Sequence, residues 1–303
     1  MIVVTTPTGN IGSQVLKDLL ANNEPIRVIA RDPDRLAPEA RKRVEVVVGS
    51  HGDGAVVSRA FQDADCVFWV VPPHPRAASV EAAYVDFARP AANALRQQGV
   101  KRVVGVSALG RGTPWATHAG LATTSWGMDD LIASSGVTFR ALTMPSFMDN
   151  LLRQVEPITK DGVFSLPIDG DRKLPSAATS DGARVAARLL LDHSWTGVAS
   201  VPVLGPEDLS YNDMARVLSE VLGRPVRFEH ISNEAFKARL MGRGMSDAMA
   251  QGNVDMWIAK ANGIDNAVKR TPESSSPTTF RDWASQVFRG AGHALSQTPG
   301  RCN

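Results

Sequence analysis

With 33 basic and 31 acidic side chains among 303 residues, the chain has a formal net charge of +2. This near balance argues against a partner that is bound mainly through charge, so we expect neither nucleic acid nor a membrane surface as a partner. The length allows one large α/β domain or two closely packed lobes.

The cysteine, histidine and hydropathy patterns indicate whether the protein has disulfides or a metal site, and in which cellular compartment it lies. The cysteines are Cys66, inside the apolar run CVFWVV, and Cys302, near the end of the sequence, so we expect no structural disulfide. The histidines and cysteines lack the spacing of zinc ligands, and we expect no metal site. No stretch is long and apolar enough to span a bilayer, and MIVVTT at the start lacks the regions of a signal peptide. We therefore expect a cytoplasmic protein.

In chain order, short β-branched runs alternate with segments of helical period. The strand-like runs are MIVVTT, IRVIAR, VEVVVG, CVFWVV, KRVVGVSA and VTFRALTMP. Between the first two, Ile11, Val15 and Leu19 recur at helical spacing. This alternation is typical of parallel strands joined by crossover helices. It predicts an α/β fold of the Rossmann type, with a doubly wound parallel sheet.

After Pro145 the pattern changes to one that predicts a smaller C-terminal α/β lobe, rich at first in glycine, proline and charge. We expect the sheet domain to comprise residues 1–150, with 176–200 returning to it. Most of 151–290 would form the smaller lobe, on the substrate side. Residues 291–303 lack any period and are predicted to form a loose tail.

The stretch TTPTGNIG follows the first strand directly and opens a helix. In that position, backbone N–H groups and the positive end of the helix can face a pyrophosphate. Gly9 would let the backbone approach phosphate, and Gly12 would let the helix approach the strand. Thr6 replaces the first glycine of the usual fingerprint, so an ordinary strand-to-helix turn remains the alternative.

The end of the second strand discriminates between cofactors, because an acidic residue there binds a ribose 2′-hydroxyl and a basic one accommodates a 2′-phosphate. The run IRVIAR ends in Arg31, with Arg35 one helical turn later. NADP(H) is therefore favoured over NAD(H). The alternative is that Arg31 is a solvated strand end that pairs with Asp32 or Asp34.

Several segments together resemble the NmrA-like group of atypical short-chain dehydrogenases/reductases. They are VTTPTGNIG, RVIARDPDRL, VFWVVPP, GVKRVVGVSALG, SGVTFRALTMPSFMDNLL, LGPEDLSYNDMARVLSEVLGRPV and PTTFRDWA, in the family's order. The resemblance covers nearly the whole chain. It implies a Rossmann-type domain with a small C-terminal lobe and an NADP(H) site over the carboxyl ends of the strands.

Carried over residue by residue, the resemblance implies contacts along the whole cofactor. The residues at the pyrophosphate would be Thr6, Thr8, Gly9, Asn10 and Ile11. Arg31, with Arg35, would hold the 2′-phosphate. The residues at the adenine and the ribose would be Ser50, His51, Val71 and Pro72. The usual GD of the adenine side is here GSHGD. Ser107 of SALG would lie beside the nicotinamide, and Pro145, in MPSFMDN, would close that end of the pocket.

The usual proton donor of the larger superfamily is missing. Ordinary members use a tyrosine and a lysine four residues apart on one helix face, but Tyr84 and Tyr211 are each followed four residues later by alanine. Counting back from SSG places Leu121 and Ser125 at the corresponding positions. Hydride transfer itself does not need the pair, so its loss narrows the acceptors to those that accept hydride without a fixed phenol.

Some residues could replace the missing proton donor, and others could form a binding surface for the hydride acceptor. Ser107 could donate a hydrogen bond to an acceptor oxygen, or have a purely structural role at the end of the strand. His118 could lie in a loop over the nicotinamide, or be an ordinary surface histidine. The apolar residues that could form a flat receptor, or simply belong to the core, are Trp115, Trp126, Phe147 and Met148.

Two functions of different class follow. One is an NADPH-dependent reductase of quinone-like or other conjugated apolar acceptors, which the resemblance to bacterial quinone, azo-dye and triphenylmethane-dye reductases favours. The other is a protein that binds NADP(H) without turnover and reports redox state to a regulatory partner. A small apolar or aromatic substrate is expected for the first, and self-association as a homodimer is open for both.

Overall fold

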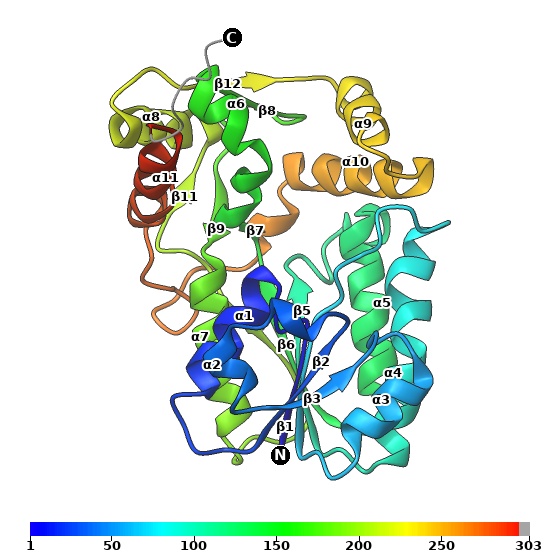
Figure 1. Cartoon of the computed structure of the whole chain (residues 1–303). Coiled ribbons are helices and arrows are strands. Elements are labelled where there is room, and N and C mark those ends of the chain that lie inside the picture. The colour runs from blue at the N-terminus through cyan, green and yellow to red at the C-terminus, as the bar shows by residue number, and fades with distance from the viewer. Residues whose placement is uncertain (297–303) are drawn as a thin grey trace.

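Seven parallel strands form the main sheet of the computed structural model, which describes residues 1–296 (Figure 1). The strands are β1 (Ile2–Thr5), β2 (Ile26–Ala30), β3 (Glu45–Val48), β4 (Cys66–Trp69), β5 (Arg102–Ala108), β6 (Thr138–Met144) and β10 (Val198–Pro202). Their order across the sheet is β10-β6-β5-β4-β1-β2-β3. The order reverses on the two sides of β1, as in a doubly wound fold, and the predicted Rossmann-type sheet is confirmed.

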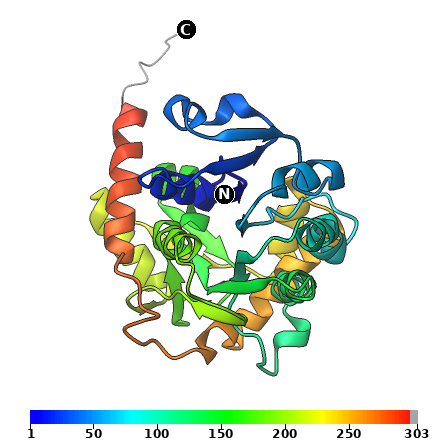
Figure 2. The same ribbon diagram turned by 90° about the horizontal axis from the view of Figure 1, so that it is seen from below.

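Helices cover both faces of this sheet (Figures 1 and 2). They are α1 (Asn10–Leu19), α2 (Pro38–Arg41), α3 (Gly54–Phe61), α4 (Phe87–Gln97), α5 (Leu121–Ala133) and α7 (Thr179–Leu191), with the short turns η1 (Pro33–Arg35), η2 (Ala82–Asp86) and η3 (Ala116–His118). The core on one face involves α1 and α7, and the core on the other involves α3, α4 and α5.

The run CVFW shows how the sequence produces this arrangement. It forms β4, and all four of its residues are buried. Val67 and Trp69 face the core shared with α3, α4 and α5, whereas Cys66 and Phe68 face the core shared with α1 and α7. Because helices cover both faces of a parallel sheet, no position of the strand needs to be polar.

The remainder of the described chain forms smaller layers beyond the carboxyl ends of the main strands (Figure 1). One small sheet has the order β11-β9-β7, and a parallel pair joins β12 to β8. The strands are β7 (Ser146–Phe147), β8 (Val163–Leu166), β9 (Leu174–Ala177), β11 (Asp208–Leu209) and β12 (Arg227–His230). The helices are η4 (Met148–Gln154), α6 (Val155–Lys160), α8 (Tyr211–Leu222), α9 (Asn233–Gly242), α10 (Asp247–Ala261), η5 (Ile264–Ala267) and α11 (Phe280–Ser296).

The chain passes between the two parts more than once. Pro145 links β6 of the main sheet to β7 of the small sheet. After β9 the chain returns through α7 to β10, which lies parallel to β6 with Val198 opposite Phe139. The segment 291–303, predicted to be a tail, overlaps the last turns of α11, and residues 297–303 lie outside the described part. Within residues 1–296, no helix combines the length and apolarity needed to cross a membrane.

Candidate active site

The turn between β1 and α1 brings the helix unusually close to the strand. A Cβ atom on Gly12 would lie 2.1 Å from the carbonyl oxygen of Thr6, so only glycine fits there. Gly9 is the N-cap of α1, no side chain caps the helix, and its first turn holds no acidic residue. The positive helix end is therefore available to an external anion, which fits the pyrophosphate of a dinucleotide.

Thr6 takes the backbone shape that glycine usually supplies. Its φ is +50°, in the left-handed region where a β-branched residue is strained. Its hydroxyl oxygen is buried and has no hydrogen-bond partner among the described residues. Thr6 therefore lowers the stability of the turn in two ways, through its strained backbone and through a buried hydroxyl group without a hydrogen bond.

Thr5 ties the first strand to its neighbour at the edge where a cofactor would lie. Its hydroxyl donates to the carbonyl oxygen of Phe68 at 2.9 Å and accepts from the N–H of Val70 at 3.0 Å. The two bonds hold the carboxyl ends of β1 and β4 together. In doubly wound sheets, ligands bind in the crevice next to such a reversal of strand order.

Arg31 follows β2 and its side chain is exposed. The two carboxylates with which it could have paired are engaged elsewhere. Asp32 accepts from the N–H of Asp34, and the carboxylate of Asp34 pairs with Arg41. Within residues 1–296, neither Arg31 nor Arg35 forms an ion pair, so both guanidinium groups are available to a phosphate.

The predicted adenine side is built around a buried histidine. The Nε2 atom of His51 donates to the carbonyl oxygen of Val70 at 3.0 Å, and its ring packs edge-on against Trp69 and Phe87. Burial lowers the pKa of His51 to about 4, with a smaller lowering contribution from the charge of Arg31. The neutral ring joins the segment after β3 to the segment after β4.

The other predicted residues of this side lie around that link. Ser50 precedes His51, and its hydroxyl accepts from the N–H of Gly52 at 3.2 Å. Val71 is buried and Pro72 is exposed directly after β4. The structure thus brings the predicted adenine and ribose contacts together at one edge of the sheet.

Ser107 is paired with a carboxyl group that sequence reasoning did not single out. Its hydroxyl donates to the Oδ2 atom of Asp129 on α5, and both side chains are buried. The Oδ1 atom of Asp129 has no partner within the described residues. Burial raises the pKa of Asp129 to about 7, although the bond from Ser107 opposes the rise. No local sequence pattern marks this pair, because its members lie 22 residues apart.

The predicted groups over the nicotinamide are dispersed. His118 is exposed at the end of η3, where its Nδ1 atom lies 2.7 Å from the hydroxyl of Thr117. Trp115 is 39% exposed. Trp126 is buried, donates to the carbonyl oxygen of Ala108 at 2.9 Å, and lines a groove beside Ser107 and Asp129.

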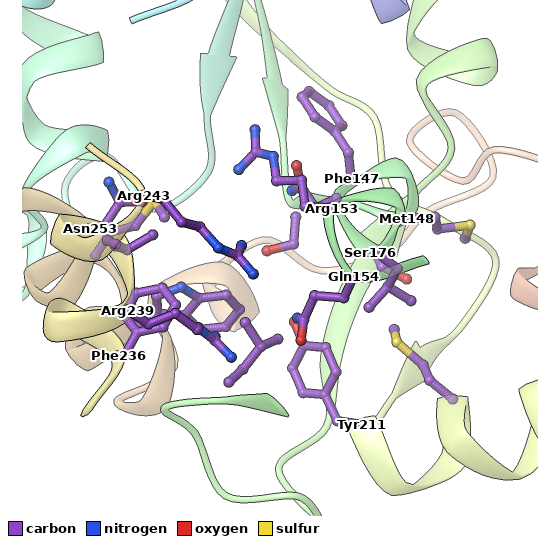
Figure 3. Close-up of a pocket in the computed structure, with 18 of the residues that line it drawn as sticks. Phe147, Met148, Arg153, Gln154, Ser176, Tyr211, Phe236, Arg239, Arg243 and Asn253 are labelled. Carbon is purple, nitrogen blue, oxygen red and sulfur yellow. The ribbon is translucent and has the colours of Figure 1, made fainter. Parts of the chain in front are cut away.

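Phe147 and Met148 do line a pocket, between the segment that follows β6 and the helices α9 and α10 (Figure 3). Its apolar wall also includes Tyr211, Phe236 and Trp257. These three residues come from three different helices, and no spacing in the sequence connects them. Only the folding of the smaller part brings them together.

The tyrosine–lysine positions hold no acid. Leu121 opens α5, and the hydroxyl of Ser125, one turn later, donates to the carbonyl oxygen of Ala122 at 2.8 Å. Burial raises the pKa of Tyr84 to about 12 and also raises the pKa of Tyr211. Both phenols therefore remain protonated near neutral pH. Among residues 1–296, no group of three or more histidine, cysteine or acidic side chains has a metal-binding arrangement.

Comparisons with known proteins agree with this geometry. Residues 7–191 match the model of the NAD(P)H-binding family. The chain is 32% identical to a Streptomyces griseus (4-alkanoyl-5-oxo-2,5-dihydrofuran-3-yl)methyl phosphate reductase, over 94% of this chain and 97% of that one. It is 28% identical to the NAD(P)H azoreductase of Xenophilus azovorans, over 94% and 96% of the two chains.

Solved structures show the same fold. The NADPH-dependent quinone oxidoreductase of Escherichia coli, complexed with NADPH, superposes with a TM-score of 0.76 at 23% identity, over 95% of this chain and 100% of that one. The Citrobacter triphenylmethane reductase, complexed with NADP(H), superposes with a TM-score of 0.75 at 20% identity, over 94% and 99%.

The strain at Thr6 leads to a stability prediction. Thr6→Gly should raise the free energy of unfolding by about 1 kcal/mol, because relief of the left-handed strain exceeds the entropic cost of glycine. Thr8→Gly, in the same turn but without positive φ, should lower it by about 0.5–1 kcal/mol. Urea titrations of both variants measure the difference, and equal losses would contradict the strain at Thr6.

The exposed guanidinium of Arg31 leads to a cofactor prediction. Arg31→Ala should weaken NADPH by about tenfold or more and NADH by far less, because only NADPH carries the 2′-phosphate. Calorimetric titration with each nucleotide measures both affinities. Arg59→Ala, which removes an exposed charge near the far end of α3, should change neither. Equal weakening of NADPH and NADH by Arg31→Ala would contradict the assignment.

The buried carboxyl of Asp129 leads to a pH prediction. Below about pH 3 the group is protonated in both states, but as the pH rises towards 7 the carboxyl of the unfolded chain ionises while that of the folded chain stays protonated. Asp129→Asn should therefore be no more stable than the parent at about pH 3, and more stable by on the order of 4 kcal/mol at about pH 8.

Thermal unfolding across that pH range tests this expectation. Asp130→Asn is the matched control, because Asp130 is 64% exposed and pairs with Arg111. A stability difference for Asp129→Asn that does not change with pH would show that the carboxyl does not titrate as described.

Proposed function

Because the chain belongs to the NAD(P)H-binding family, in its NmrA-like branch of atypical short-chain reductases, and is an NAD(P)H-dependent oxidoreductase, we propose that it reduces a conjugated, largely apolar acceptor of the quinone type with NADPH. The observation that carries the proposal is the position of the pocket. Ser146, Phe147 and Met148 line it and follow β6 after Pro145, and the carboxyl end of β6 belongs to the edge where the cofactor would lie.

The availability of Arg31 supports NADPH as the reductant. Its guanidinium is exposed at the end of β2, and the neighbouring carboxylates are engaged elsewhere. A 2′-phosphate would supply the missing negative charge through charge-assisted hydrogen bonds. The uncapped N-terminus of α1 would face the pyrophosphate of the same molecule.

The character of the pocket wall supports a flat, conjugated acceptor. Phe147, Met148 and Trp257 present aromatic and sulfur-containing surface, which suits a delocalised ring system. Similar relatives are named as an azoreductase and a quinone oxidoreductase, and both names denote acceptors with conjugated double bonds.

The chemistry divides between cofactor and protein. Bound NADPH supplies the hydride. The apolar wall keeps water away from the acceptor and holds it in place, which promotes transfer by proximity. Tyr211 contributes a protonated hydroxyl to the pocket wall, which Ser146 also lines, and these two hydroxyl groups are suited to hold an acceptor oxygen. Conjugated acceptors accept hydride without a tuned phenol beside them, which accords with Leu121 and Ser125 on α5.

Filling the pocket should separate acceptor reduction from cofactor binding. Met256→Trp places an indole in the pocket wall and should lower kcat/KM for a quinone such as menadione at least about tenfold, while NADPH affinity stays unchanged. Met241→Trp, at a position of α9 that is 44% exposed, should change neither quantity. The loss of NADPH absorbance with and without acceptor measures the rates.

The same assay decides between turnover and binding alone. NADPH oxidation that depends on an added quinone, azo dye or triphenylmethane dye supports the reductase. Saturable NADPH binding with no oxidation across that panel would contradict it and would favour a redox sensor that acts through a protein partner.

A further inference from the structure

The pocket beyond β6 carries a charge that an apolar acceptor does not need. Three arginines line it, Arg153, Arg239 and Arg243, and no aspartate or glutamate is among its lining residues. Many other arginines and lysines of the described chain pair with a carboxylate, as in the pair Arg216–Asp213 on α8. The lining of this pocket, by contrast, holds three cationic side chains and no carboxylate.

Arg239 is held in place by neutral groups. One guanidinium nitrogen donates to the hydroxyl of Ser165 at 2.7 Å, and the other donates to the carbonyl oxygen of Ser165 at 3.0 Å. The guanidinium lies 5.3 Å from the ring centroid of Phe236. Its Nε atom is buried and has no partner in the described part of the chain. These contacts orient the group but leave its charge unopposed.

Arg243 adds a second positive charge beside the first. Both guanidinium-bearing residues line the same pocket, and burial, together with the charge of Arg243, lowers the pKa of Arg239. Within residues 1–296, neither forms an ion pair, and Asp247 at the start of α10 is engaged by Lys237 at 2.7 Å. Such a pair of like charges becomes favourable when an anion binds between them.

The remaining polar groups of the pocket do not supply the missing negative charge. The amide of Gln154 is engaged at both ends by the backbone of Ser165, at 3.2 and 3.0 Å. Asn253 donates to the carbonyl oxygen of Met249 at 2.9 Å. These amides shape the pocket and are not free to neutralise the arginines.

The charged and apolar walls lie at different places in the pocket. Figure 3 shows Phe147 on the side of the main strands, with Arg239 and Phe236 on the opposite side. The side chain of Arg243 projects towards the middle of the pocket (Figure 3). A ligand that spans the pocket would therefore place one end near the strand ends and its other end at the guanidinium groups.

We propose that the acceptor carries an acidic group, a phosphate monoester or a carboxylate, which Arg239 and Arg243 bind while its conjugated part lies against Phe147. Arg153, on η4, adds a further positive charge to the lining of the same pocket. Guanidinium groups suit this task because their planar donors match the oxygens of phosphate and carboxylate. The inference rests on the proposed reductase and narrows its substrate class to anionic acceptors.

Binding measured without turnover tests the anion site itself. The probes are naphthoate, naphthyl phosphate and the neutral naphthamide, titrated by calorimetry into the full chain saturated with NADP⁺. We expect both anions to bind at least about tenfold more tightly than naphthamide, with a preference that weakens as salt rises. The ratio between the two anions distinguishes a phosphate site from a carboxylate site.

Two variants and a control test whether Arg239 and Arg243 cause the preference for anions. Arg243→Gln removes an exposed guanidinium and should weaken both anions about tenfold, with a far smaller effect on naphthamide. Arg239→Gln should do the same, and Arg243→Gln keeps the test valid if loss of the Ser165 contacts unfolds the chain. Arg216→Gln removes a charge from the same lobe outside the pocket and should leave all three affinities unchanged. Equal affinity of the parent for naphthoate and naphthamide would overturn the proposal, as would anion binding unaffected by Arg243→Gln.

A parallel rate measurement separates this inference from the proposed function. Naphthoquinone sulfonate and unsubstituted naphthoquinone are compared as acceptors, and we expect the sulfonate to have the higher kcat/KM through a lower KM. Tight anion binding without reduction of either quinone would support the anion site and contradict the proposed reductase activity. Reduction of both quinones with equal kcat/KM would support the reductase activity and contradict the anionic substrate class.

Discussion

The close approach of α1 to β1 is the constraint on which the candidate site depends. Because Gly12 has no side chain, the helix begins directly against the carbonyl oxygen of Thr6. That contact fixes the helix against the strand, and the uncapped N-terminus of α1 lies at the carboxyl end of β1, the strand next to β4. Thr6, in the same turn, has a left-handed backbone, so the strain and the available positive end of the helix lie in one short segment.

The two parts of the molecule divide the work of a reductase. The main sheet supplies the turn between β1 and α1, Arg31 and the edge around His51, all at the carboxyl ends of strands. The smaller part supplies the pocket wall, and Pro145 joins the two directly. Because β9 leads back through α7 to β10, the pocket wall is anchored to the sheet at two points. Such anchoring suits hydride transfer, which requires cofactor and acceptor to be held in register.

The arginines of the pocket show why net charge says little about a site. A chain with a formal charge of +2 has no overall field that attracts anions. Nevertheless, Arg239 and Arg243 stand together without a carboxylate in the pocket wall. Burial lowers the pKa of Arg239, and at Asp129 it raises the pKa of the carboxyl group to about 7. Local placement, not composition, determines the electrostatics of both places.

The sequence by itself determined the sheet and the turn between its first strand and helix, because both are local: β-branched runs specify buried strands, and TTPTGNIG lies within one strand-to-helix connection. It also pointed to Phe147 and Met148, which lie just beyond the predicted strand VTFRALTMP. Only the tertiary structure decided the rest of the pocket, since Tyr211, Arg239 and Trp257 come from separate helices with no shared period. The pairing of Ser107 with Asp129 likewise depends on how α5 packs across β5, and packing between elements leaves no mark in local spacing.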